Sequence, residues 1–149
     1  ETQRVHVYTD KLPMTTAEED IHNHRYDFNS KILKGMLTQE CFLVCYDSGG
    51  EFLRVQESCN PDNKVEARPT HADLEFNGIQ NFGPGSSYFI GHKEFHRVSS
   101  KNAVTLITRS EYKKELADVV YHYKQVPICP FSHKVEESKL WEIVAEALK

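Results

Sequence analysis

The sequence predicts an all-β sandwich or barrel followed by one C-terminal helix. Short runs rich in β-branched and aromatic residues recur through most of the chain, separated by Gly, Pro, Asn and Asp turn signals. Residues 135–148 show a helical pattern of apolar residues instead. With 149 residues, the chain has the length of a single domain that can bury one substantial core.

The expected strands follow a regular rhythm along the chain. In order they are Arg4–Tyr8, Ile21–Leu33, Glu40–Tyr46, Glu51–Gln56, Ala72–Ile79, Tyr88–Ile90, Phe95–Ser99 and Ala103–Thr108. The turn signal Ser48-Gly49-Gly50 between two of these strands predicts a hairpin. Residues 57–70 are polar and interrupted by proline, so we expect a long loop there, of the kind that often recognises substrate.

The C-terminal part of the chain has a different pattern. Residues 111–123 fit both a helix and a strand, and we expect a short helical turn followed by a strand. In the helix expected at 135–148, Leu140, Val144 and Leu148 form an apolar stripe. This stripe predicts that the helix packs on the outside of the barrel, or alternatively that it lies in a dimer interface.

Composition excludes several classes of function. The net charge is −4, and no run of Lys or Arg exceeds two residues, so a nucleic-acid groove is disfavoured. No apolar stretch approaches the roughly 20 residues that span a bilayer. The chain opens on Glu1 without a signal-like apolar segment. Its four cysteines form no Cys-x-x-Cys pair, which favours free thiols and a cytoplasmic location.

Two histidines near the N-terminus point to metal chemistry. His22 and His24 are two residues apart on the expected strand Ile21–Leu33, so their imidazoles project from the same face. A pair of this kind supplies half of a metal site. By the same alternation Phe28 shares the face of the histidines, whereas Asp27 faces away from them unless a β-bulge turns it inward.

A downstream segment contains a third histidine in a suitable place. Gly83-Pro84-Gly85 predicts a turn, Tyr88–Ile90 a short strand and Gly91 a second tight turn, after which a strand carries His96. His92 lies on that second turn, where we expect it at the rim of a pocket or in solvent.

Both histidine segments resemble the motifs of the cupin superfamily. The first family motif runs His-x-His, three or four residues, Glu, six residues and Gly, and His22, His24 and Gly35 stand at those places. The second motif has Gly, Pro and Gly followed by a histidine just past a turn. Gly83-Pro84-Gly85 and His96 match it with irregular spacing.

This resemblance covers about residues 20–109. It implies a double-stranded β-helix, the jelly-roll barrel of cupins, as the core of a single domain spanning 1–149. Residues 110–149 then form a C-terminal extension that carries the helix.

The chain departs from the family pattern at Phe28, which stands where cupins usually have a glutamate ligand. The resemblance therefore implies a three-histidine site of His22, His24 and His96, similar to that of thiol dioxygenases. Three neutral imidazoles bind divalent transition metals well, and an octahedral ion would keep up to three positions open for substrate and dioxygen. Fe(II) is the metal that the resemblance favours, with Zn, Mn, Ni or Cu as alternatives.

The resulting hypothesis is a non-haem, metal-dependent oxygenase that acts on a small polar molecule, anionic or thiol-containing. Two alternatives stay open: a metal-dependent isomerase, epimerase or lyase, and a cupin module that binds a small ligand without converting it. We expect dioxygen and a small molecule as partners, no nucleic acid or membrane, and a homodimer.

Three further residues are candidates for contact with substrate. Tyr26 lies on the histidine face of its strand, from which its hydroxyl could reach substrate or bound oxygen, although core packing would explain it equally well. Arg97 or Arg109 could hold a carboxylate or phosphate through paired hydrogen bonds, with a surface salt bridge as the alternative for each.

The cysteines Cys41 and Cys45 share a strand face, and we expect them to be small buried apolar filler. A covalent Cys–Tyr link of the kind found in some thiol dioxygenases remains an open alternative for either of them.

Overall fold

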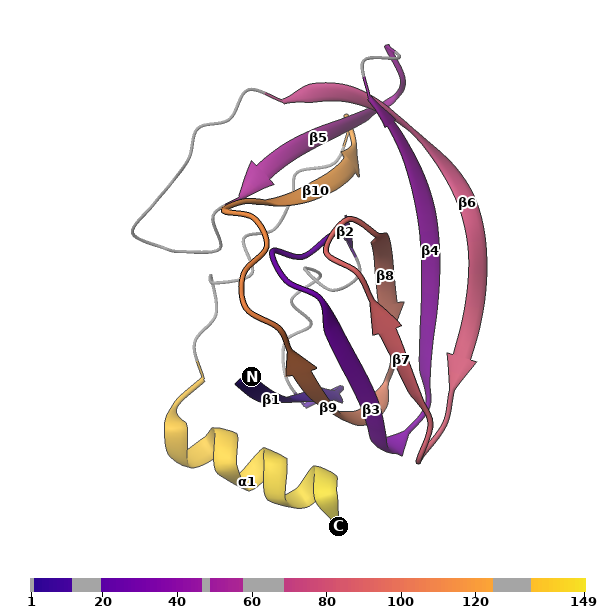
Figure 1. Cartoon of the computed structure of the whole chain (residues 1–149). Coiled ribbons are helices and arrows are strands. Elements are labelled where there is room, and N and C mark those ends of the chain that lie inside the picture. The colour runs from indigo at the N-terminus through magenta and orange to yellow at the C-terminus, as the bar shows by residue number, and fades with distance from the viewer. Residues whose placement is uncertain (1, 12–19, 47–48, 58–68, 125–134) are drawn as a thin grey trace.

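The computed structural model describes residues 2–11, 20–46, 49–57, 69–124 and 135–149. In these ranges the protein is mostly antiparallel β-structure with one helix at its C-terminal end (Figure 1). The elements are β1 (Thr2–Thr9), β2 (Ile21–His22), β3 (Phe28–Gly35), β4 (Leu37–Tyr46), β5 (Phe52–Glu57), β6 (Thr70–Phe82), β7 (Ser87–Ile90), β8 (Phe95–Ser99), β9 (Asn102–Arg109), β10 (Ala117–His122) and α1 (Glu137–Leu148). The expected all-β class with a C-terminal helix is confirmed.

The strands form two sheets. One is four-stranded, in the order β1-β9-β3-β7, and the other closes on itself in the order β10-β2-β8-β4-β6-β5. In Figure 1 the long strands β4 and β6 run side by side along one flank, β5 and β10 lie together at one end, and α1 lies at the other. Closure removes the free edges that an open sheet would present.

The buried apolar residues form two hydrophobic cores. One core joins β3, β7 and β9 of the four-stranded sheet to β4 and β8; its buried members are Phe28, Ile32, Leu37, Tyr88, Ile90, Val98 and Ile107. The other lies inside the closed sheet and gathers Ile21, Ala72, Phe95 and Val120, with Phe42, Val44, Phe52 and Leu74 packed against them. The barrel wall around β2, β8 and β4 therefore has apolar side chains on both faces.

The buried face of β4 changes along its length. Leu37 and Gln39 are buried in the first half, whereas Phe42 and Val44 pack into the barrel core in the second half. The change coincides with a register shift against β6 between Cys41 and Phe42. Beyond this irregularity the odd-numbered residues no longer face a core.

The cysteine prediction was wrong because a core covers the odd-numbered face of β4 only in its first half, at Leu37 and Gln39. Cys45 lies on the outer face beyond the irregularity and is exposed, whereas Cys41 is only partly buried. Burial raises the pKa of the Cys41 thiol. Neither residue serves as fully buried filler.

Two predictions of local structure were also wrong. The continuous strand Ile21–Leu33 is split, because the chain leaves β2 after His22 and resumes as β3 at Phe28. The helical turn expected before β10 is absent, since residues 111–116 contain bends instead. The strand expected after it is present as β10.

The predicted hairpin between β4 and β5 does not form. β6 lies between them, and Ala72 of β6 is the register partner of both Tyr46 and Phe52. β4 and β5 both run antiparallel to β6, so the chain does not reverse at this turn signal but crosses the end of β6. The long loop predicted at 57–70 falls mostly outside the described residues.

Gly35 connects β3 to β4 through a conformation that suits glycine alone. Its φ is +75°, and a Cβ at this position would lie 1.6 Å from the backbone oxygen of Asn102. Since that oxygen belongs to the paired strand β9, the clash cannot be relieved by a rotamer change. The turn therefore depends on the missing side chain.

We expect Gly35→Ala to lower the free energy of unfolding by at least about 2–3 kcal/mol, from backbone strain and the clash together. For a protein of this size the melting temperature should fall by about 4–12 °C. Gly85→Ala is the matched control, because Gly85 has a φ of +85° but open space around the Cβ position. Equal effects of the two substitutions in thermal denaturation would contradict the steric explanation.

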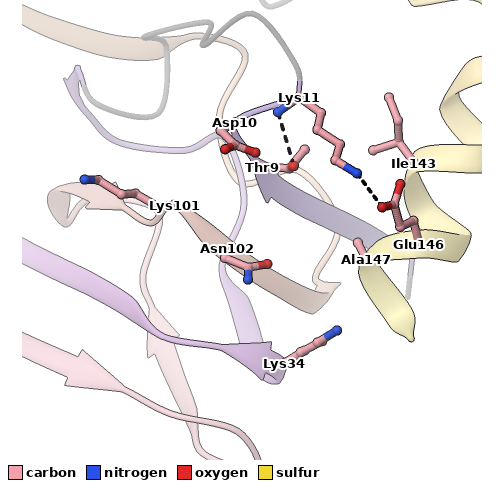
Figure 2. A pocket seen from close by; sticks show the side chains of 9 residues that line it. All are labelled: Thr9, Asp10, Lys11, Lys34, Lys101, Asn102, Ile143, Glu146 and Ala147. Carbon is pink, nitrogen blue, oxygen red and sulfur yellow. Dashed lines mark hydrogen bonds and ion pairs between the residues drawn. The ribbon is translucent and has the colours of Figure 1, made fainter.

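The helix α1 packs beside β1 and β9 through only part of its apolar surface. Ile143 is its buried residue, whereas Trp141 and Leu148 are 62% and 53% exposed. Figure 2 shows Lys11 reaching from the end of β1 to an ion pair with Glu146, above a cavity of about 380 Å³. Among the described residues the helix thus packs on the four-stranded sheet and not, as the sequence had predicted, on the closed barrel. The predicted homodimer stays a prediction.

Within the described ranges, α1 is too short and too polar to cross a lipid bilayer, and no other helix is present.

Candidate metal centre

Three short stretches of chain bring the predicted histidines together. His22 ends β2, His24 follows two residues later, and His96 is the second residue of β8. His22 and His96 are direct register partners in the antiparallel pair β2–β8. Cross-strand partners project from the same face, so this register places both imidazoles together. Their chain neighbours Ile21 and Phe95 pack into the barrel core on the other face.

The three imidazoles form a compact group. Their ligand nitrogens all lie within 4.8 Å of one another, and the Nε2 atoms of His24 and His96 are 2.9 Å apart. Two nitrogens bound to one ion at about 2.1 Å are themselves separated by about 3.0 Å at a right angle. The spacing of this pair therefore fits two ligands of one ion. No other group of three His, Cys, Asp or Glu side chains gathers in this way among the described residues.

The tautomer of His22 is fixed by a carbonyl group. Its Nδ1 lies 2.7 Å from the backbone oxygen of Asp20, so Nδ1 carries the proton and donates it. In the neutral ring the other nitrogen, Nε2, is then the atom that would bind an ion. Metal-binding histidines commonly have a carbonyl partner of this type, which orients the ring.

Burial keeps the other two histidines neutral. Loss of hydration lowers the pKa of both His24 and His96 well below the ordinary value, and the neighbouring charge of His22 lowers it further. Neutral imidazole is the form that binds metal, so the donor set fits a divalent transition ion.

A polar anchor holds the histidine segment in place. Asn23, between His22 and His24, is 3% exposed and points to the barrel side. Its backbone N–H donates to the carbonyl oxygen of Asp118, and its amide nitrogen donates to the Asp118 carboxylate at 2.8 Å. Its amide oxygen accepts from the backbone N–H of Asp118 at 2.8 Å. These three bonds continue the β2–β10 pairing past the end of β2.

The Phe28 ring packs against two of the three imidazoles. It is 3% exposed, and its ring centroid lies 4.7 Å from that of His24 and 6.0 Å from that of His96. The expectation that Phe28 shares the histidine face therefore holds, although the strand between them is broken. No carboxylate belongs to the cluster among the described residues.

Asp27 and His92, the two candidates for an additional ligand, bind each other instead. The Asp27 carboxylate accepts from the backbone N–H and from Nδ1 of His92, each at 2.7 Å. These bonds lower the pKa of Asp27. Neither residue belongs to the three-histidine cluster.

Tyr26 and Arg109 form an aromatic and cationic wall next to His24. The Tyr26 ring centroid is 5.6 Å from that of His24. The Arg109 guanidinium carbon lies 4.9 Å from the Tyr26 ring and 4.7 Å from the ring of Tyr112. Arg109 Nε is buried and has no hydrogen-bond partner among the described residues. Tyr26 thus contacts His24 directly, and Arg109 lies next to the histidine group by packing on the Tyr26 ring.

Arg97 is placed differently. It follows His96 on β8 and projects from the opposite face, where Nε and Nη2 bind the Glu40 carboxylate at 2.5 and 3.1 Å. Its guanidinium also lies over the Phe42 ring. The structure does not bring Arg97 to the histidines. Its ion pair with Glu40 agrees with the alternative expectation of a salt bridge.

Three residues that contact the histidine segment or Arg109 were not singled out from the sequence. Asn23 and Asp118 are buried polar residues, and Tyr112 completes the stack on Arg109. Asp118 is a charged residue within the otherwise apolar strand Ala117–His122, which indicates a buried polar contact. Its partner Asn23 could not be identified from the sequence. Tyr112 had no signal of its own.

Comparison of the chain with protein-family models, curated proteins and solved structures finds no match.

Proposed function

We propose that this protein is a metal-dependent oxygenase of the cupin type, with His22, His24 and His96 as ligands of an iron ion. Its substrate is a small, anionic or thiol-containing molecule. The proposal includes the finer description of the fold as a double-stranded β-helix, which rests on the two sequence motifs. The observation that supports it best is the convergence of three imidazoles, of which burial keeps His24 and His96 neutral, without any carboxylate among the described residues.

The charge of the centre determines the class of substrate. Three neutral ligands leave the full positive charge on a divalent ion, because Phe28 replaces a carboxylate. An anionic group is therefore favoured in the open positions. When bound, a redox-active ion of this kind supplies the site at which substrate and dioxygen can meet.

The residues of the chain orient and shield the substrate. Phe28 keeps water away from one side of His24 and His96. Arg109, held between two aromatic rings, offers to a substrate carboxylate a buried Nε–H that has no partner among the described residues, and the Tyr26 ring lies next to His24. In this proposal Arg109 binds substrate and Tyr26 positions it.

The first test is metal analysis of protein purified without added metal, followed by measurements of oxygen uptake after loading with Fe(II). Three probes separate the recognition elements: 3-mercaptopropionate carries thiol and carboxylate, propionate only the carboxylate, and 2-mercaptoethanol only the thiol. We expect one equivalent of metal and the fastest uptake with 3-mercaptopropionate.

Other outcomes would replace the proposal. A bound zinc ion without oxygen uptake would favour isomerase, epimerase or lyase chemistry, in which the ion acts as a Lewis acid. Tight retention of a probe without its conversion would favour the ligand-binding module. Protein with no affinity for any of these ions would refute the metal centre itself.

A further inference from the structure

A second cavity, of about 450 Å³, opens in the wall of the closed barrel. Its side chains differ in kind from those around the histidines. Phe42, Val44, Tyr46 and Phe95 provide an apolar wall, while Asn23, Lys93, Glu94, Lys114 and Asp118 provide polar groups. A largely apolar lining with a few convergent polar groups is typical of small-molecule sites.

The cavity exists because the barrel wall is incomplete at this level. β4 pairs with β8 only as far as Phe42, whose partner Phe95 begins β8. From Leu43 to Tyr46, β4 continues with β6 as its partner on one side, and the cavity borders this stretch. β2, on the far side of β8, contributes only two residues. The topology thus leaves a window into the barrel.

Asp118, at the base of the cavity, has no capacity left to bind a ligand. Its carboxylate accepts hydrogen bonds from Asn23, Arg54, Gln56 and Lys114 at 2.7–3.2 Å. Burial by itself would raise the pKa of Asp118, but these hydrogen bonds outweigh it and lower the pKa. The carboxylate stays ionised and fully paired. A cationic ligand therefore finds no acceptor there.

Lys114 does keep a donor. Its ammonium group has three N–H bonds, of which one points to the Asn23 amide oxygen at 2.7 Å and one to Asp118 at 3.1 Å. The side chain is 26% exposed. Around Asp118, Lys114 and Arg54 together leave one positive charge in excess. At the edge of the cavity the exposed charges of Lys93 and Glu94 offset each other, so one positive charge remains in excess.

We propose that this cavity binds a small monocarboxylic acid with an apolar, preferably aromatic, body. The carboxylate accepts from Lys114, and the body packs on Phe42, Val44 and Phe95. This site is distinct from the metal centre, because Ile21 and Phe95 face the barrel interior while their neighbours His22 and His96 face the other side.

Isothermal titration of metal-free protein with three probes of equal shape tests the charge requirement. We expect phenylacetate to bind, phenylacetamide to bind at least about tenfold more weakly because it lacks the charge, and phenethylamine not to bind. Equal binding of the acid and the amide would overturn the proposal. Since no metal is present, the result is independent of the metal-dependent function.

Substitutions of Lys114 test whether this residue binds the carboxylate of the ligand. Lys114→Met keeps the aliphatic stem without the charge and should weaken phenylacetate at least about tenfold, whereas Lys114→Arg should retain affinity within a few fold. Lys31→Met on β3 is the matched control, because it removes one exposed charge from a residue that does not line the cavity. Unchanged affinity in Lys114→Met would overturn the assignment. If that variant fails to fold, chemical-shift changes of the unmodified protein decide: they must centre on Phe42, Val44 and Lys114.

Discussion

His96→Ala is expected to lower metal affinity at least about 100-fold, since loss of even an indirect support of a metal ligand costs 10–100-fold. Only His22 and His24 would remain as ligands, and neither Asp27 nor His92 is close enough to replace the third. The substitution also removes a buried side chain, which should cost about 2–4 kcal/mol of stability. Metal content after dialysis measures the first effect, and thermal denaturation the second.

His92→Ala provides the matched control. It removes an imidazole from the same segment, but one that is bound to Asp27 and lies outside the cluster. We expect its metal content to equal that of the parent. If His96→Ala keeps its metal while His92→Ala loses it, His92 is the third ligand and the placement of β8 against β2 has no role in binding.

The class of fold was predictable because strand positions follow from local composition. Runs of β-branched and aromatic residues marked every long strand, and glycine at position 35 marked a turn whose φ of +75° no other residue adopts easily. The helix was predictable for the same reason, since its apolar period is local. These features depend on neighbours in the chain alone.

The pairing of the strands was not predictable, because it depends on contacts distant in sequence. β6 separates β4 from β5 even though a turn signal joins them, and β10 closes the barrel by pairing with both β2 and β5. The exposure of Cys45 follows because, among the described residues, no element covers the odd-numbered face of β4 in its second half, which no local pattern records.

In the candidate site, spacing predicted the three histidines correctly as a spatial group, because alternation and one cross-strand register suffice to bring them together. Phe28 also packs against them as predicted, although alternation does not explain its position, because the chain leaves the strand between His22 and Phe28. Alternation does separate Arg97 from the group, since adjacent residues on β8 face opposite sides. The anchor between Asn23 and Asp118 spans 95 residues, so only the fold reveals it.

Phe28→Glu is expected to make the stability of the protein depend on metal. Phe28 packs against Ile32, Tyr88 and Ile90, so its replacement forfeits about 2–3 kcal/mol of apolar burial. A carboxylate in this position is also desolvated, which adds several kcal/mol in the metal-free protein. An ion at the neighbouring histidines would bind that carboxylate as a fourth ligand and offset both costs.

The measurement is the melting temperature with and without Fe(II) or Zn(II), compared with Phe28→Gln. Glutamine has nearly the same shape but no charge, so both variants lose the same packing. At a metal concentration about 100 times the dissociation constant, binding stabilises a protein by about 2.7 kcal/mol. Because the carboxylate tightens binding, metal should raise the melting temperature of the glutamate variant more than that of the glutamine variant or the parent.

The filled position should also suppress oxygen uptake, since one site for substrate or dioxygen is lost. Equal stabilisation of the two variants by metal would mean that residue 28 does not face the ion, and the three-histidine explanation of this centre would then fail.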